Sequence, residues 1–283
     1  MTVETTGTTG TGTTRTAAGF AALHRPGEPL LLPNAWDYAT AAVLAHSGFP
    51  AVGTTSLGVA AAAGKPDAAG TTRAETLAVA RTLTGLPVMV SVDLEGGYDE
   101  DPATVAGLVA EVAATGAVGV NLEDGRADGS LRPAALHAEV VAAVKERVPD
   151  LFVNARTDVW WLRGDDGTEA GRIDAALERA AAYAAAGADG VFVPAVATDD
   201  SVAALARGCV VPLNVLFLPG RHTVPRLAEL GVARISLGSL LLRASLHSVA
   251  ATAAAIRSGT SDPAPGAPSY TEISGLLPVA NPR

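Results

Sequence analysis

Short apolar runs alternate with longer amphipathic or small-residue stretches between residues 29 and 257. The runs are four to seven residues long and rich in Val, Leu and Ala, which is typical of strands buried on both faces of a parallel sheet. We predict strands at Pro29–Pro33, Ala51–Thr55, Val88–Val92, Val118–Leu122, Leu151–Ala155, Gly190–Val193, Val210–Leu216 and Val232–Leu237.

The stretches between these runs carry the signals of helices. Asp37 is placed to cap the first helix, and Gly48, Gly116 and Gly187 stand where helices should end. We predict helices at Tyr38–His46, Arg73–Leu83, Thr104–Ala114, Pro133–Arg147, Arg172–Ala186, about 201–207, about 223–230, and Leu240–Arg257. After the second strand we expect a turn at Ser56–Gly58 and then a loop of small residues at 59–72.

Eight strand–helix repeats in about 240 residues favour an α/β fold of the (β/α)8 TIM-barrel type over an open doubly wound sheet. No G-x-G-x-x-G follows the first strand, which argues against a dinucleotide-binding fold. We therefore expect one catalytic barrel domain at 17–257. The Thr/Gly-rich residues 1–16 should form a disordered tail, and the Pro-rich residues 258–283 a tail that packs loosely or on a neighbouring subunit.

Composition narrows the classes of partner. The net charge of −9 disfavours nucleic acid or an anionic membrane as a partner. Cys209 is the single cysteine, so an intrachain disulfide is excluded and a reducing compartment is expected. The sequence has no apolar run long enough to span a membrane and no secretory signal pattern, so we predict a cytoplasmic protein.

Acidic residues follow several of the predicted strands. In a barrel the carboxyl ends of the strands share one rim, where the active site lies. The acids expected at this rim include Asp67, Asp93, Glu95 and Glu123, with Asp124 and Asp158 beside them. Carboxylates that meet in one place repel each other unless a cation holds them, and an all-oxygen ligand set selects Mg²⁺ or Mn²⁺. A structural network of ion pairs is the alternative, and Asp67 could be merely solvated.

Several other residues near the rim fit a small anionic substrate. Arg156 can bind a carboxylate or phosphonate with two hydrogen bonds, and Thr55, Ser56 and the backbone N–H groups after them can form an anion nest. Arg156 could instead be a structural arginine of the barrel. Asn214 could contact substrate or be an interior amide, and Trp36 could line the mouth or fill the core. For Trp160 and Trp161 we expect packing.

The chain resembles the isocitrate lyase/phosphoenolpyruvate mutase superfamily over residues of about 18–257. The motifs that carry the resemblance are Pro33–Asp37, Gly53–Gly58, Pro66-Asp67, Ser91–Tyr98, Val120–Asp124 and Asn154–Asp158. The resemblance implies that Asp93 binds Mg²⁺ directly, and that Glu95, Glu123 and Asp67 hold waters of the ion. It also implies that Arg156 and the Thr55-Ser56-Leu57 backbone bind the substrate anions. Members are usually tetramers that exchange the last barrel helix, so we expect a homo-oligomer, a dimer or tetramer.

The chain departs from the family pattern where the reaction is defined. The lyases carry K-[KR]-C-G-H after the L-E-D motif, and the mutases a Lys and an Asn, but Gly125–Pro133 here has none of these catalytic residues. A Glu that the pattern places after the strand-seven Asn is also absent, because Val215 and Leu216 follow Asn214. The chain thus resembles an uncharacterised branch. We predict a Mg²⁺-dependent lyase that cleaves a C–C bond of a small 2-oxo or 2-hydroxy acid through an enolate, with Arg156 and Glu123 catalytic. P–C mutase or hydrolase chemistry on phosphonopyruvate, and a non-catalytic 2-oxo acid binder, are the alternatives.

Overall fold

The computed structural model describes residues 15–162 and 167–278, and within them nine parallel strands form one sheet. The strands are β1 (Leu30–Leu32), β2 (Asn34–Ala35), β3 (Ala51–Thr54), β4 (Met89–Asp93), β5 (Gly119–Glu123), β6 (Phe152–Arg156), β7 (Gly190–Val193), β8 (Leu213–Leu216) and β9 (Arg234–Ser236). From β2 to β9 each strand pairs with the next one in the sequence, and β1 pairs with β9.

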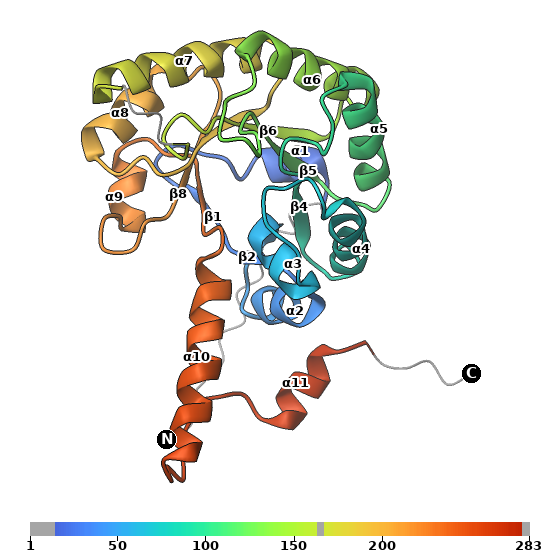
Figure 1. Cartoon of the computed structure of the whole chain (residues 1–283), viewed down its shortest axis with the longest axis vertical. Helices are drawn as coiled ribbons and strands as arrows, with labels where there is room; N and C mark the ends of the chain where they lie inside the picture. Colours follow the sequence, from blue (N-terminus) through green and yellow to red (C-terminus); the bar gives the residue numbers. More distant parts are fainter. Residues whose placement is uncertain (1–14, 163–166, 279–283) are drawn as a thin grey trace.

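The barrel closes through its first strand, which Pro33 divides into β1 and β2. Proline has no N–H to donate to a neighbouring strand. On one side of it β1 pairs with β9, and on the other β2 pairs with β3, so that Leu30 is opposite Arg234 and Asn34 opposite Gly53. Counted as one strand, β1 and β2 make the sheet a barrel of eight strands (Figure 1). The predicted TIM-type fold is confirmed.

The described residues form eleven helices, most of which cover the outside of the sheet (Figure 1). They are α1 (Ala17–Ala21), α2 (Tyr38–His46), α3 (Ser56–Ala63), α4 (Arg73–Leu83), α5 (Pro102–Ala113), α6 (Ala134–Arg147), α7 (Glu169–Ala185), α8 (Asp199–Gly208), α9 (Val224–Glu229), α10 (Leu240–Arg257) and α11 (Tyr270–Leu276). As predicted, Asp37 caps α2, and its carboxylate accepts the Thr40 N–H at 2.7 Å.

Side chains of each strand alternate between the helices and the barrel interior. On β6, Val153 and Ala155 pack into the cluster shared with the helices, whereas Phe152 and Arg156 belong to the other face. Phe20 of α1 meets Phe152 edge to face at 5.3 Å between ring centroids, in an apolar cluster toward the amino ends of the strands. Arg156, at the carboxyl end of β6, faces a cavity.

One prediction about the fold is wrong. The structure has a helix, α3, from Ser56 to Ala63, where we expected a turn and the start of a loop. The segment S-L-G-V-A-A-A-A has no alternation of polar and apolar positions, so an amphipathic pattern could not reveal it. Its last residue is followed by Gly64 at φ 66°, the left-handed conformation that commonly ends a helix.

Both ends of the chain add helices to the barrel. Most of the predicted N-terminal tail, residues 1–14, lies outside the described residues, and the Thr16 hydroxyl caps α1 by accepting the Gly19 N–H at 3.0 Å. The Pro-rich C-terminal segment contains α11, and Leu276 of α11 packs against the main core cluster. The helix before α11, α10, extends away from the barrel (Figure 1). Within the described part of the chain, no helix has the length and apolarity needed to cross a bilayer.

Candidate active site

A cavity of about 580 Å³ opens at the carboxyl ends of the strands. Its lining contains most of the residues that the sequence singled out, namely Thr55, Ser56, Leu57, Asp67, Asp93, Glu95, Glu123 and Arg156. They come from the ends of β3, β4, β5 and β6 and from the loops after them. Residues spread over about a hundred positions of sequence therefore meet in one place, because parallel strands of a barrel end at one rim.

Asp93 ends β4 and lies between the first turn of α3 and β5. Its Oδ2 accepts the backbone N–H of Ser56 at 3.2 Å, and Asn121, its register partner on β5, lies beside it at the cavity. Burial raises the pKa of Asp93, with Arg156 as the main opposing charge, and the Asp67 charge raises it further. The Ser56 N–H, predicted to bind substrate, is thus bonded to Asp93 in this structure.

Glu95 has φ 50°, a left-handed backbone conformation that a non-glycine residue adopts at a cost. Its carboxylate accepts the Thr72 hydroxyl at 2.7 Å and the Gly70 N–H at 3.2 Å, so the loop before α4 holds it in place. The Tyr98 hydroxyl extends this network to Thr72 at 3.1 Å. Burial raises the pKa of Glu95, and the charges of Asp93 and Asp67 contribute in the same direction.

Glu123 and Asp158 both contact the guanidinium of Arg156. The Glu123 Oε2–Nη1 distance is 2.5 Å and the Asp158 Oδ1–Nε distance is 2.6 Å. Burial raises the pKa of Glu123 to about 8 against the opposing charge of Arg156, and neighbouring acids add to the rise. Trp161 covers the guanidinium, with the Arg156 Cζ 5.6 Å from the ring centroid. The site therefore combines a fixed cation with a carboxyl group that can hold a proton near neutral pH.

Two predicted substrate contacts lie elsewhere. Asn214 is buried on β8, where its amide exchanges hydrogen bonds with the Ser236 hydroxyl at 3.1 and 3.2 Å. Trp36 is half-buried beside α3, and a Cβ added to Gly58 would lie 2.7 Å from its Cβ, so Gly58 allows this close packing. Among the described residues, the cavity lining does not include either Trp36 or Asn214.

Asn121 and Trp161 line the cavity but were not predicted as site residues. Asn121 lies two positions before Glu123 on β5, and residues two apart share one face of a strand, so the pattern could have identified it. Trp161 was assigned to packing, yet its side chain lines the cavity over Arg156 and the residue is 52% exposed. Its neighbour Trp160 is buried in a core cluster, which confirms the packing expectation for that residue.

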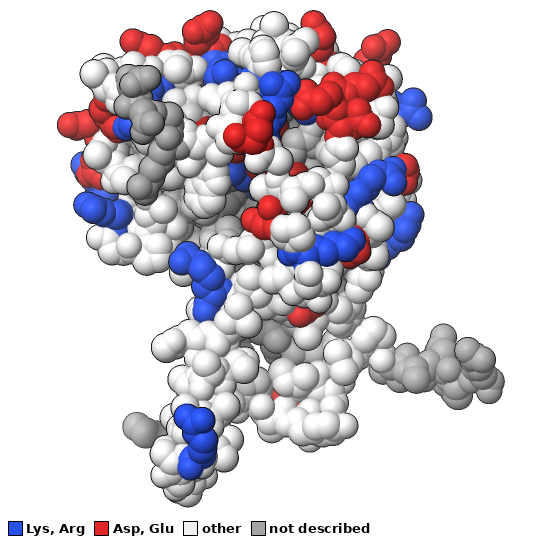
Figure 2. Space-filling model, viewed as in Figure 1, with Lys and Arg blue, Asp and Glu red and all other residues white. Residues whose placement is uncertain are grey.

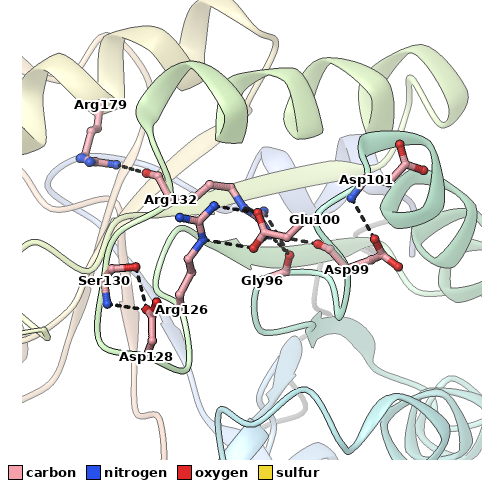
Figure 3. A network of polar contacts seen from close by, with 9 residues as sticks. All are labelled: Gly96, Asp99, Glu100, Asp101, Arg126, Asp128, Ser130, Arg132 and Arg179. Atoms are coloured by element: carbon pink, nitrogen blue, oxygen red, sulfur yellow. Dashed lines mark hydrogen bonds and ion pairs between the residues drawn. The ribbon is translucent and has the colours of Figure 1, made fainter.

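The loop after β5, residues 125–133, is tied to the loop after β4 by two arginines (Figure 3). Arg132 is buried and donates to the carbonyls of Gly96 and Asp99 as well as to the Glu100 carboxylate. Arg126 lines the cavity and binds Glu100 with two hydrogen bonds of 3.1 and 2.8 Å. These arginines hold residues 125–133 against the loop after β4. Figure 2 shows acidic side chains gathered over the α5–α6 part of the molecule.

Asp124 anchors the base of the same loop from inside the protein. Its Oδ2 accepts the Tyr183 hydroxyl at 2.6 Å and the Arg179 Nη1 at 2.9 Å, and its Oδ1 accepts the Asp158 N–H at 2.9 Å. The Asp124 side chain is completely buried. It therefore supports Asp158, and through it Arg156, without lining the cavity.

The donor set fits a hard divalent cation. The acids at the cavity are all oxygen donors. Burial raises the pKa of Asp93, Glu95 and Glu123, and the charge of Asp93 raises the pKa of Glu95 and Glu123 further. Within the described residues, no three His, Cys, Asp or Glu side chains converge closely enough to ligate one ion directly. Mg²⁺ commonly takes one or two carboxylates and keeps several waters, which suits one direct ligand surrounded by water-holding acids.

Comparison with known proteins defines the family. The family model described as "Phosphoenolpyruvate phosphomutase" matches residues 20–257. The chain belongs to the isocitrate lyase/phosphoenolpyruvate mutase superfamily, whose members are Mg²⁺-dependent lyases and mutases that bind small carboxylates and are generally oligomeric.

Individual relatives span both kinds of chemistry. The chain is 41% identical to an uncharacterized protein of Mycobacterium tuberculosis, over 91% of this chain and 95% of that one. It is 32% identical to the 2-methylisocitrate lyase of Bacillus subtilis, over 70% of this chain and 65% of the enzyme. A solved structure from Burkholderia cenocepacia, provisionally named a phosphonomutase, is 40% identical with a TM-score of 0.80, and the match covers 84% of this chain and 99% of that one.

Proposed function

We propose that this protein is a Mg²⁺-dependent lyase that cleaves a C–C bond of a small 2-oxo or 2-hydroxy carboxylic acid by way of an enolate. The observation that supports this most is one cavity in which Asp67, Asp93, Glu95 and Glu123 face each other beside Arg156. Arg156 already pairs with Glu123 and Asp158, so one cationic side chain serves several carboxylates and a divalent cation would offset the negative charge that remains. A small di-acid chelated to that metal could also reach the free N–H groups of Arg156.

Asp93 is the proposed direct ligand of the ion, with Glu95, Glu123 and Asp67 holding its waters. The fixed position of Glu95 supports this, because two hydrogen bonds keep its carboxylate at the cavity before any ligand arrives. When bound, the metal would supply a Lewis acid that stabilises the negative charge developing on the substrate oxygen. Mn²⁺ has the same ligand preferences and is the alternative occupant.

Arg156 is the proposed anchor of a substrate carboxylate. Asp158 fixes its Nε and Trp161 covers it, so its remaining N–H groups are oriented before substrate binds. Thr55, Ser56 and Leu57 line the same cavity at the N-terminus of α3, whose dipole favours a second anionic group, while the Ser56 N–H itself is bonded to Asp93. Trp36 and Asn214 would act behind these residues, by supporting α3 and β8.

Glu123 is the proposed proton carrier. In the metal-free site burial raises the pKa of Glu123 to about 8, and the carboxyl group bonds to the arginine that would hold the substrate, so it lies where a proton would be exchanged. As the C–C bond of a 2-hydroxy acid breaks, the ionised Glu123 carboxylate would accept the hydroxyl proton and then give it to the carbanion of the leaving fragment. This role substitutes for the cysteine that the family's lyases have in the loop after β5.

Two alternatives keep support. P–C chemistry on a phosphonopyruvate is favoured by the 40% identity to the Burkholderia cenocepacia protein provisionally named a phosphonomutase. A non-catalytic binder of 2-oxo acids is favoured by the absence of lyase and mutase residues from Gly125–Pro133. Incubation with a panel of 2-hydroxy di-acids, 2-oxo di-acids and phosphonopyruvate, with and without Mg²⁺, separates the three. Mg²⁺-dependent products from a di-acid, with none from phosphonopyruvate, support the lyase. Products from phosphonopyruvate support P–C chemistry. Thermal stabilisation by oxalate and Mg²⁺, without product from any compound, supports the binder.

We also propose that the chain is a homo-oligomer in which α10 packs on a neighbouring barrel. The helix extends from its own barrel, and its exposed apolar residues include Leu246, Val249 and Ile256, at 56%, 67% and 59% exposure (Figure 1). Figure 2 shows this projection as mostly uncharged surface. Apolar area of this kind is normally covered by a partner. Either a dimer or a tetramer would cover the exposed apolar side chains of α10.

A further inference from the structure

Arg234 is a buried cation in the middle of the barrel that the proposed mechanism does not use. It lies on β9 and is completely buried. Its Nε donates to the Ser236 hydroxyl at 3.2 Å and its Nη2 to the Asn121 Oδ1 at 3.2 Å. Within the described part of the chain, no carboxylate lies close enough to form an ion pair with it, and its Nη1 has no hydrogen-bond partner. Burial lowers the pKa of Arg234 to about 9, and the charge of Asp93 only partly opposes this. A buried cation whose hydrogen-bond partners are all neutral is costly, so its retention needs a reason.

The contacts of Asn121 supply that reason. A guanidinium can only donate hydrogen bonds, so the atom of Asn121 that faces Arg234 must be the amide oxygen. The Asn154 amide donates to the same oxygen at 2.9 Å. With Oδ1 occupied by two donors, the NH₂ end of Asn121 is the end that remains for Asp93, its register partner on β4. Burial raises the pKa of Asp93, and the Asn121 side chain opposes that rise. Rotation of the amide by half a turn would set its NH₂ group against the N–H groups of Arg234 and a carbonyl against a carboxylate.

We infer that Arg234 is a positioning residue: it fixes the orientation of the Asn121 amide, and Asn121 in turn holds the Asp93 carboxylate in the rotamer that binds the metal. This inference rests on the proposed function, since it needs Asp93 to be a metal ligand. The chain Arg234–Asn121–Asp93 runs across β9, β5 and β4 through the barrel interior. Groups that orient a metal ligand in this way typically affect metal affinity by about 10- to 100-fold.

If Arg234 acted only through its charge, its removal would change the Mg²⁺ affinity in the opposite direction. Removal of a positive charge near the site should strengthen the binding of a cation, whereas loss of an oriented ligand should weaken it. Arg234→Met removes every donor and the charge while keeping most of the side-chain volume. Arg234→Lys keeps the charge and can still donate toward Asn121. Asn121→Ala removes the link itself.

The test is a calorimetric titration of Mg²⁺ into the purified wild-type protein, the variants Arg234→Met, Arg234→Lys and Asn121→Ala, and the double variant Arg234→Met/Asn121→Ala, with thermal unfolding recorded for each. We expect about 10-fold weaker Mg²⁺ binding in Arg234→Met and in Asn121→Ala, and a double variant no weaker than the single ones. Arg234→Lys should stay within about threefold of wild type.

Four results would overturn the inference. Wild-type or tighter binding in Arg234→Met shows that charge, not orientation, is what Arg234 supplies. Losses that multiply in the double variant show that the two residues act independently. If Arg234→Met does not fold, wild-type affinity in Asn121→Ala is sufficient by itself to reject the chain of contacts. A wild-type protein that binds no Mg²⁺ at all rejects the proposed function, and this inference with it.

Discussion

Glu123 and Arg156 are opposite each other in the register of β5 and β6, and their side chains form an ion pair of 2.5 Å at the mouth of the barrel. The strand pairing thus brings together the proposed proton carrier and the proposed substrate anchor. Asp158, two residues further along, fixes the other edge of the same guanidinium. A substrate carboxylate that binds Arg156 therefore arrives next to the carboxyl group of Glu123.

Replacement of Asp93 should remove the metal site. In Asp93→Ala we expect no measurable Mg²⁺ binding by calorimetry, because the remaining acids are placed to hold waters rather than the ion. Asp99→Ala is the matched control, since that acid also lines the cavity but lies outside the proposed ligand set, and its affinity should match wild type. Equal Mg²⁺ affinity in Asp93→Ala and wild type would refute the assignment.

Arg156→Ala should separate anion binding from metal binding. The variant should bind Mg²⁺ to within about threefold of wild type yet bind oxalate, in the presence of saturating Mg²⁺, at least about 100-fold more weakly, because a charge-assisted pair of hydrogen bonds is lost. Oxalate-dependent thermal stabilisation measures this. Arg81→Ala, at an exposed arginine of α4, controls for the loss of one positive charge. Unchanged oxalate affinity in Arg156→Ala would exclude it as the anchor.

The metal-free protein should lose stability as the pH rises. An acid whose pKa is raised by folding binds a proton more tightly in the folded than in the unfolded state, so the free energy of unfolding falls between the two pKa values. For Glu123 this window runs from 4.5 to about 8, and burial raises the pKa of Asp93 and Glu95 in the same direction. Urea unfolding in EDTA at pH values across the window measures the slope. Glu123→Gln should flatten it, and an unaltered slope in that variant would show that Glu123 is not the group responsible.

Arg132 should matter more for stability than Arg126, although both bind Glu100. Arg132 is only 4% exposed in its side chain and satisfies two carbonyls of the loop after β4, so Arg132→Ala should destabilise by roughly 2–3 kcal/mol. Arg126 forms an exposed pair, and Arg126→Ala should cost less than about 1 kcal/mol. Urea denaturation of the two variants measures the free energy of unfolding of each. Equal losses of that free energy would show that burial of the arginine does not determine its contribution.

The oligomer should depend on α10. Leu246→Glu places a charge on the apolar side of the helix and should shift the protein to smaller species in sedimentation-velocity runs, since a partner could no longer cover that face. Leu136→Glu is the control, because Leu136 is an exposed leucine on α6, away from α10. An unchanged sedimentation profile for Leu246→Glu would remove α10 from the interface.

The sequence predicted the barrel and the acids of its rim because short stretches of neighbouring residues determine both. A buried strand reveals itself by its apolar run, and a residue directly after it, such as Asp93 or Glu123, must stand at the rim whatever the rest of the chain does. α3 escaped detection because its small apolar residues carry no period. Arg234 and Arg132 escaped for a different reason. Their roles depend on how far a long side chain reaches across the fold, to Asn121 in one case and to Gly96 in the other, and no local pattern encodes that reach.

The central claim is that a divalent cation joins the acids of the cavity to a small anion held by Arg156. The most direct measurement is a crystal structure with Mn²⁺ and oxalate, in which the anomalous signal of the metal locates the ion. The account predicts one metal peak in the cavity at coordination distance from Asp93, about 2.1 Å, with Glu95 and Glu123 linked to it through water and oxalate between the metal and Arg156. An ordered cavity with no metal peak beside Asp93 at saturating Mn²⁺, or oxalate bound without any ion, would contradict it.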